Sequence, residues 1–174
     1  MKAVSNAGPL IALAKLGSLG LLLKLFNEIF IPREVFIEVV TNGLLRGASD
    51  AGSVDYLVRQ GDIFVKDITL PATLPEWAQM IDRGEVEVIF LALRESPDWL
   101  LIDNAHARKA ARSMGLPLKG TIGLLLEALR RRYLSLREFE LLIHDIQAQP
   151  NLWISESLCA RALMRARSTT SSRS

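Results

Sequence analysis

The chain contains the segment Trp99-Leu100-Leu101-Ile102-Asp103-Asn104-Ala105-His106-Ala107-Arg108, and its pattern is the strongest indication of the fold. The first four residues are all apolar, which is typical of a strand buried on both faces of a parallel sheet. Two polar residues follow, and the spacing of alanines then predicts a helix over residues 105–114. A buried strand that passes through a short polar turn into a helix is the building unit of α/β proteins.

The same alternation extends in both directions along the chain. Short apolar runs predict further strands at 3–5, 29–31, 63–65 and, at a sheet edge, 116–118. Helical patterns lie between and after them, at 9–16, 19–26, 32–40, 54–60, 84–94, 121–132, 135–147 and 155–166. Residues 41–50 read as a polar connection and 68–76 as a loop. Strands separated by helices indicate a parallel sheet, and such sheets bind ligands at the carboxyl ends of their strands.

Length and composition indicate one domain. The 174 residues are 49% hydrophobic, and we expect a single domain over 1–167 followed by a disordered, serine-rich tail at 168–174. Residues 161–174 carry four arginines and no acid, so the remaining 160 residues have 17 basic and 19 acidic side chains. The apolar run near residues 19–30 is too short and too polar to span a bilayer. We therefore expect a cytoplasmic protein without a membrane segment.

Polar residues follow two predicted strands directly. Asn6 comes after the first strand, and Asp103 and Asn104 come after the strand at 99–102. Glu38 lies in the predicted helix that follows the second strand, and Glu85 begins the predicted helix before the strand that ends at Asp103. Hydrolysis of a phosphodiester requires an activated water and compensation of negative charge, and Mg²⁺ or Mn²⁺ bound by oxygen ligands supplies both.

Each of these residues also has a purely structural interpretation. Asp82 and Glu85 have the spacing of a capping box at a helix start. Glu38 fits a solvated helix face, and Asn6 fits a turn. Asp103 fits a helix cap, a role for which Asn104 competes. Spacing alone leaves these alternatives open.

Five segments, in this order along residues 3–130, resemble motifs of PIN-domain (PilT N-terminus) proteins of the VapC-like branch. The segments are Val4–Gly17, Ile31–Val39, Asp82–Ile89, Leu100–Arg108 and Gly120–Leu125. The resemblance implies a three-layer α/β/α sandwich with a central, mostly parallel sheet. It also implies a metal-dependent ribonuclease, often the toxin of a toxin–antitoxin pair.

Transferred position by position, the resemblance implies a catalytic set of Asn6, Glu38, Glu85 and Asp103. Of these, Asn6, Glu85 and Asp103 would bind Mg²⁺ or Mn²⁺, with Glu38 as a ligand or as the group that orients the attacking water. The substrate would contact three further residues, namely Asn104, Arg108 and Thr121. The chain departs from the family pattern at Asn6, where an acid is usual, because an amide oxygen binds a cation without adding charge.

Two functional interpretations follow from this pattern. The first is a metal-dependent endoribonuclease with an RNA substrate, a small antitoxin protein as its partner and a homodimeric state. The second is a PIN-like module of weak catalytic power that regulates by binding RNA or protein, which the missing charge at Asn6 favours. An unrelated α/β domain with capped helices and no site fits the ordered motifs poorly.

Overall fold

A computed structural model describes residues 1–149, 151, 152 and 154–171. The chain divides into two compact units, Met1–Gly120 and Thr121–Ser174, which are described separately below. Within the described residues, no helix is both long and apolar enough to cross a membrane.

The first unit is built on a five-stranded sheet. In chain order its strands are β1 (Lys2–Ser5), β2 (Glu28–Pro32), β3 (Phe64–Lys66), β4 (Trp99–Leu101) and β5 (Leu118–Lys119). They lie in the order β3-β2-β1-β4-β5, and all four neighbouring pairs are parallel. From β1, the next two strands in the chain, β2 and β3, are added on one side of the sheet, and β4 and β5 are added on the other. The strand order therefore reverses between β1 and β4.

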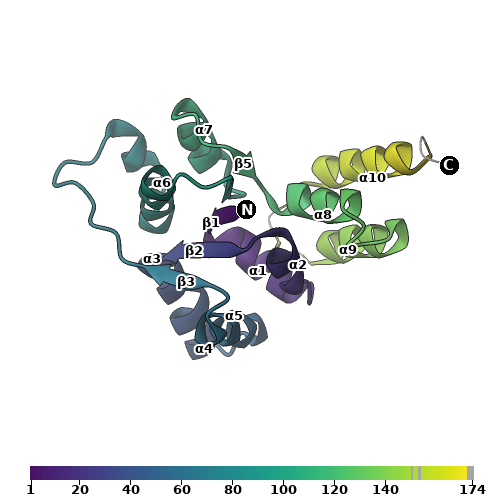
Figure 1. Cartoon of the computed structure of the whole chain (residues 1–174), viewed down its shortest axis with the longest axis horizontal. Coiled ribbons are helices and arrows are strands. Elements are labelled where there is room, and N and C mark those ends of the chain that lie inside the picture. Colours follow the sequence, from purple (N-terminus) through teal and green to yellow (C-terminus); the bar gives the residue numbers. More distant parts are fainter. Residues whose placement is uncertain (150, 153, 172–174) are drawn as a thin grey trace. The chain divides into compact units, whose positions relative to one another are not determined.

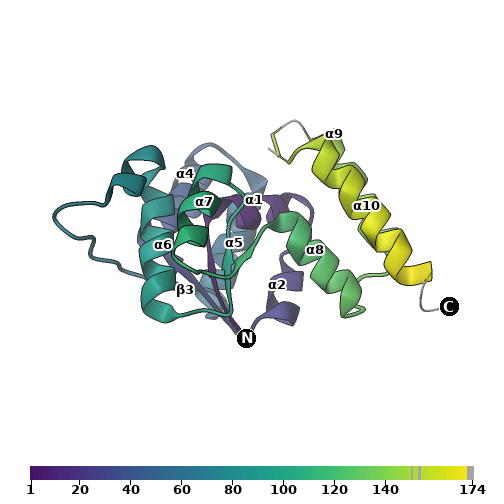
Figure 2. The ribbon, with the colours of Figure 1, turned by 90° about the horizontal axis from the view of Figure 1, so that it is seen from above.

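Helices cover both faces of this sheet (Figure 1). On one side, α1 (Ala7–Lys15) packs against α5 (Ser49–Gln60), with α2 (Gly20–Leu25) nearby. On the other side, α6 (Arg83–Glu95) packs on β1, β2 and α7 (Ala105–Ser113), as the view from above also shows (Figure 2). This is the three-layer α/β/α sandwich with a parallel central sheet that we predicted.

The central strands carry the core. Their fully buried apolar side chains are Ala3, Val4, Ile29, Ile31, Leu100 and Leu101. Predominantly apolar strands are required here because helices exclude water from both sheet faces. The observed strands match the predicted runs closely, except that β5 lies at 118–119 rather than 116–118.

The segment after β2 differs from the prediction of one helix over 32–40 and a polar connection over 41–50. It consists of α3 (Arg33–Phe36), a π-helical turn (Ile37–Thr41) and α4 (Asn42–Leu45), and α5 then begins at Ser49. Val39 and Val40 are both buried, so packing of adjacent residues holds the wide turn in place. A 3-10 helix, Glu76–Met80, begins at the last residue of the predicted loop.

The second unit consists of three helices that pack on one another, α8 (Thr121–Arg130), α9 (Leu136–Ala148) and α10 (Glu156–Ser171). Ser135 caps α9, because its hydroxyl accepts the Glu138 N–H and the Glu138 carboxylate returns to the Ser135 N–H at 2.7 Å. Helix α10 continues to Ser171, past the predicted start of the tail at 168, since each further residue of a formed helix adds a backbone hydrogen bond. Residues 172–174 lie outside the described residues, and the single-domain expectation stays a prediction.

Candidate functional site

The reversal of strand order brings Asn6 and Asp103 to the same edge of the sheet. Ser5 and Leu101 are register partners at the carboxyl ends of β1 and β4. The Asn6 backbone N–H donates to the Leu101 carbonyl at 2.9 Å, which extends the pairing one residue beyond the sheet. Ligands of open α/β sheets bind at this kind of position, so the fold itself places both residues where a site is expected.

Asn6 precedes α1 but does not cap it. An asparagine at this position ordinarily accepts a hydrogen bond from the first turn of the helix, and the Asn6 side chain makes no such bond. The residue is only 7% exposed, and its Oδ1 atom is buried with no hydrogen-bond partner among the described residues. Leaving a buried acceptor unsatisfied costs about 1–3 kcal/mol, so this oxygen needs an explanation that a turn does not provide.

The Asp103 carboxylate lies between two glycines. A Cβ atom added at Gly8, in the first turn of α1, would lie 3.5 Å from Asp103 Oδ2. A Cβ atom added at Gly120 would lie only 2.6 Å from Asp103 Oδ1 and 3.3 Å from an Arg108 guanidinium nitrogen. The space for this carboxylate therefore depends on the absence of a side chain at Gly120.

Glu38 and Glu85 belong to a second acidic group. Glu38 lies in the π-helical turn, and its Oε2 would be 3.6 Å from a Cβ atom at Gly84, the residue before Glu85. Glu85 itself is 7% exposed and accepts the Asp82 backbone N–H at 3.3 Å. The capping box of Asp82 and Glu85 is thus present, and it holds the Glu85 carboxylate close to Glu38.

The electrostatics of this group favour a bound proton or cation. Burial raises the pKa of Glu85 to about 6, the Asp82 N–H opposes that rise, and the charges of Asp82 and Glu38 add to it. The pKa of Glu38 is also raised, first by partial burial of its carboxyl and then by Asp82 and Glu34, while Arg46 lowers it. Carboxylates that repel one another in this way are stabilised when a cation compensates their charge.

The three residues predicted to contact substrate have separate positions. Asn104 is the cap of α7, because its Oδ1 accepts the backbone N–H groups of His106 and Ala107 at 2.8 and 3.1 Å. Arg108 donates to the Ile102 carbonyl at 2.7 Å beside the Asp103 carboxylate. Thr121 is the first residue of α8, in the second unit, and its relation to the other residues stays a prediction.

The structure therefore brings the predicted residues together as two groups on packed elements. Asn6, Asp103 and Arg108 lie at the ends of β1 and β4, and Glu38 and Glu85 lie beside the start of α6, which packs on β1. In the part of the chain that the structure describes, no three His, Cys, Asp or Glu side chains are close enough to hold a metal ion between them. Convergence of all four oxygen donors on one ion stays a prediction.

The residues present nevertheless fit a hard divalent cation. Mg²⁺ is commonly held through only one or two carboxylates and keeps several waters. The unsatisfied Oδ1 of Asn6 is an oxygen donor of the required type, and Asp103 lies across the same strand ends. A mixed set of amide, carboxylate and water oxygens therefore suits this edge of the sheet.

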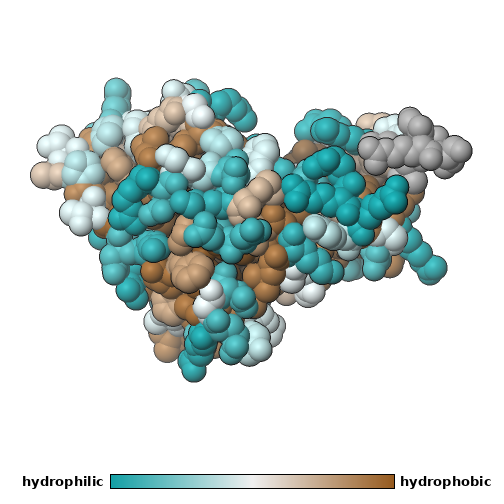
Figure 3. All heavy atoms as spheres, viewed as in Figure 1, coloured by the Kyte–Doolittle hydropathy of each residue, from teal (hydrophilic) through white to brown (hydrophobic). Residues whose placement is uncertain are grey.

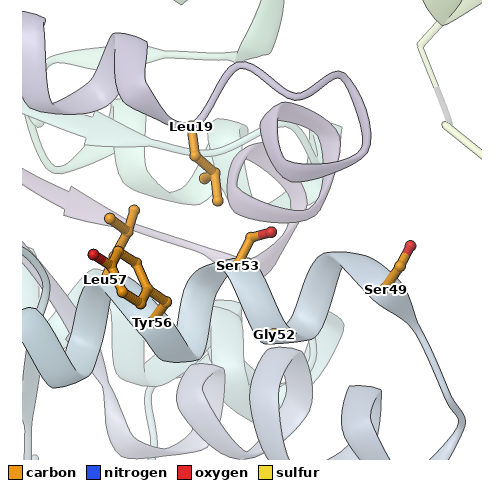
Figure 4. A pocket seen from close by; sticks show the side chains of 6 residues that line it. All are labelled: Leu19, Ser49, Gly52, Ser53, Tyr56 and Leu57. Atoms are coloured by element: carbon orange, nitrogen blue, oxygen red, sulfur yellow. The ribbon is translucent and has the colours of Figure 1, made fainter.

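A pocket of about 440 Å³ lies away from these residues (Figure 4). Leu19 faces α5 across it, and the remaining lining residues, Ser49, Gly52, Ser53, Tyr56 and Leu57, all belong to α5. No carboxylate lines the pocket, so it offers a divalent cation nothing comparable to the strand-end site.

Several contributors to the site were missed in the sequence. Gly8 and Gly84 let carboxylates approach two helix starts, Gly120 makes room for Asp103, and Asp82 and Glu34 raise the pKa of Glu38. The glycines stand inside the motifs quoted above, and a glycine in the first turn of a helix is itself a sign of close approach. The acidic neighbours lie only three and four residues from the predicted ones.

These features define a class of α/β protein. Its oxygen donors suit a hard divalent cation and lie at the strand ends where the strand order reverses. The sequence matches the family DUF3368, described as a PIN domain, over residues 2–168. The chain belongs to this PIN-domain family, whose members are generally nucleases that act on nucleic acids with divalent metal ions.

Comparison of structures supports the fold. The chain is similar to a PilT N-terminus domain protein from the hyperthermophilic archaeon Sulfolobus solfataricus, with a TM-score of 0.53 and 17% sequence identity. The similarity covers 74% of this chain and 94% of that one. No match was found among curated proteins.

Proposed function

We propose that the protein is a metal-dependent endoribonuclease whose site lies at the carboxyl ends of β1 and β4. The observation that carries this proposal is the buried Oδ1 of Asn6, which lacks a hydrogen-bond partner among the described residues and lies across the strand ends from Asp103. A cation would satisfy this oxygen and offset the carboxylate charge at the same time.

Asp103, Glu85 and Asn6 would hold the cation, and Glu38 would orient the attacking water. A bound Mg²⁺ or Mn²⁺ supplies a more acidic water and offsets charge on the scissile phosphate. Glu38 suits a role as proton acceptor because its raised pKa is closer to neutrality than that of a free glutamate. Arg108, fixed by the Ile102 carbonyl beside Asp103, would bind a flanking phosphate through its other guanidinium donors.

Cleavage of a mixed RNA preparation in Mn²⁺ tests this proposal. Asp103→Asn removes the central carboxylate with little change of shape, and Asp62→Asn, at an exposed turn, is the matched control. We expect cleavage by the wild type and by the control, and its loss in Asp103→Asn. Titration calorimetry with Mn²⁺ then shows whether Asp103→Asn has lost the binding of the ion or only the cleavage of RNA.

The absence of charge at Asn6 supports the second candidate, a PIN-like module that binds RNA or protein with weak catalysis. Only Glu38, Glu85 and Asp103 then contribute carboxylates, which lowers the expected affinity for the ion. Mn²⁺ binding without cleavage, by wild type and Asp103→Asn alike, would favour this alternative.

We further propose that the protein is the toxin of a toxin–antitoxin pair and forms a homodimer, in the manner of the VapC-like proteins it resembles. Support comes from large apolar side chains exposed on α4 and α5, with Leu44, Leu45 and Tyr56 exposed by 50%, 82% and 61%. Large apolar side chains exposed on two helices that contact each other suit a protein interface. Co-expression with the product of a short neighbouring reading frame, followed by co-purification and light scattering, tests both parts.

A further inference from the structure

The second unit has an unusual distribution of charge. Residues 121–174 contain eight arginines, no lysine and five acidic residues. Residues 1–120 contain 13 basic and 14 acidic side chains, so the net positive charge of the protein resides in residues 121–174.

Most of these arginines lie at one end of the unit. Helix α8 ends at Arg130, α9 begins six residues later, and α10 packs on both. Arg167 donates to Glu140 at 2.7 Å, which fixes the last turns of α10 beside the first turns of α9. We call this surface the arginine end; it comprises Arg130, Arg131, Arg132, Arg137, Arg165 and Arg167. Hydrophilic residues gather over α8 on the face shown in Figure 3.

Two of these arginines stay outside the ion pairs of the surface. Glu127 accepts from both Arg130 and Arg131, at 3.1 and 2.7 Å, so one carboxylate serves two guanidinium groups. The exposed side chains of Arg132 and Arg137 make no hydrogen bond or ion pair with any residue that the structure describes.

Helix stability alone does not explain this arrangement. A basic residue at a helix C-terminus interacts favourably with the helix dipole, which accounts for Arg130 at the end of α8. Arg137 is the second residue of α9, where the same dipole disfavours a positive charge. A partner that is itself negative accounts for both positions.

Two exposed side chains that directly adjoin the arginine end in sequence suit the bases of a nucleic acid. Tyr133 is 38% exposed and directly follows Arg132, and Met164 is 65% exposed and directly precedes Arg165 on α10. Exposed aromatic rings among basic residues provide surfaces on which unpaired bases stack. Guanidinium groups bind phosphate oxygens through two parallel hydrogen bonds and stack on bases, whereas lysine does neither.

We propose that the arginine end binds single-stranded RNA through its phosphates and through stacking on Tyr133. That the nucleic acid is RNA rests on the proposed function, whereas the charge and the exposed ring point to single-stranded nucleic acid independently of it. The surface adds a binding contact that requires no metal and belongs entirely to α8–α10.

Fluorescence anisotropy with a labelled 12-nucleotide single-stranded RNA in EDTA tests this proposal on the full chain. The double variant Arg132→Gln/Arg137→Gln removes two charges from exposed, unpaired side chains. Lys24→Gln/Arg59→Gln, on α2 and α5, removes the same charge from the first unit and is the matched control. Because EDTA removes divalent ions, the result does not depend on whether the protein cleaves RNA.

We expect the Arg132→Gln/Arg137→Gln variant to bind about tenfold more weakly near 0.15 M salt, with the slope of log K against log salt shallower by about 0.7 for each phosphate that the variant no longer neutralises. Arg132→Lys/Arg137→Lys should retain that slope. The proposal is overturned if both glutamine variants bind RNA as the wild type does, or if both lose affinity equally. Equal binding of a duplex of the same length, or binding of anionic lipid vesicles in place of RNA, would overturn it as well.

Discussion

Replacing Glu85 by glutamine should stabilise the protein at neutral pH while impairing the site. The carboxylate is 7% exposed, and its pKa is about 6 in the folded protein against 4.5 for the free group. That difference corresponds to about 2 kcal/mol of unfavourable charge at pH 7. Glutamine keeps the shape and can still accept the Asp82 N–H, so the capping box survives. We therefore expect Glu85→Gln to unfold with a free energy about 1–2 kcal/mol larger at pH 7.

The pH dependence of this gain has a defined sign. Above about pH 6, Glu85 is charged in the folded and unfolded states, and the folded state bears the full cost of the buried charge. Between pH 6 and 4.5 the folded state takes up a proton that the unfolded state does not, so the wild type recovers stability as the pH falls. Below pH 4.5 the side chain is neutral in both states, and the difference between wild type and variant should vanish.

Urea unfolding of both proteins at pH 7.5, 6, 5 and 4 measures this difference, with Glu28→Gln at an exposed strand position as the control. The control should change stability by less than about 0.5 kcal/mol at every pH. Addition of Mn²⁺ should stabilise the wild type and have little effect on Glu85→Gln. A Glu85→Gln variant that is less stable than the wild type at pH 7.5, or whose advantage does not shrink toward pH 4, would refute the reasoning.

Further predictions concern the strand-end site and the helix starts. Asn6→Asp should lower stability without metal by about 1–3 kcal/mol, because it buries a charge near Asp103, and should raise Mn²⁺ affinity in calorimetry; unchanged affinity would contradict this. Gly120→Ala should displace the Asp103 carboxylate, 2.6 Å from the new Cβ, and reduce Mn²⁺ binding. Gly52→Ala, in open space on α5, should instead raise the free energy of unfolding by up to about 1 kcal/mol. Asn104→Ala should lower the free energy of unfolding by about 1 kcal/mol through loss of the cap. Asn104→Asp should keep both stability and cleavage. A cleavage defect in Asn104→Asp at normal stability would instead indicate that Asn104 contacts the substrate.

The sheet and most of its helices could be predicted because their signals are local. The buried strand before Asp103 is a short apolar run, and α6 shows both a capping box and helical periodicity, so each element can be recognised within its own segment. The edge strand β5 was displaced because two residues carry little pattern. Helix α5 begins five residues earlier than predicted, since serine and glycine near its start are weak helix formers.

The site could be predicted in its residues but not in its geometry. The positions of Asn6 and Asp103 follow from the rule that ligands bind at strand ends. Asn104 rather than Asp103 caps α7 because it directly precedes the first residue of the helix. The spacing in the sequence allowed either residue to be the cap. The unsatisfied oxygen of Asn6 and the place of Gly120 beside Asp103 depend on contacts between distant segments, which no local pattern contains.

The π-helical turn at Ile37–Thr41 affects how this protein is compared with others. A single-turn π-helix holds one more residue than the α-helical turn it replaces, so residues on one side of it rotate by about 100° relative to those on the other. In a homologue with an uninterrupted helix, a sequence alignment without a gap would therefore pair structurally equivalent residues only on one side of this turn. On the other side, the residue that such an alignment pairs with a given position lies on a different face of the helix. The acidic partner of Glu85 in a homologue therefore has to be identified by superposition of structures.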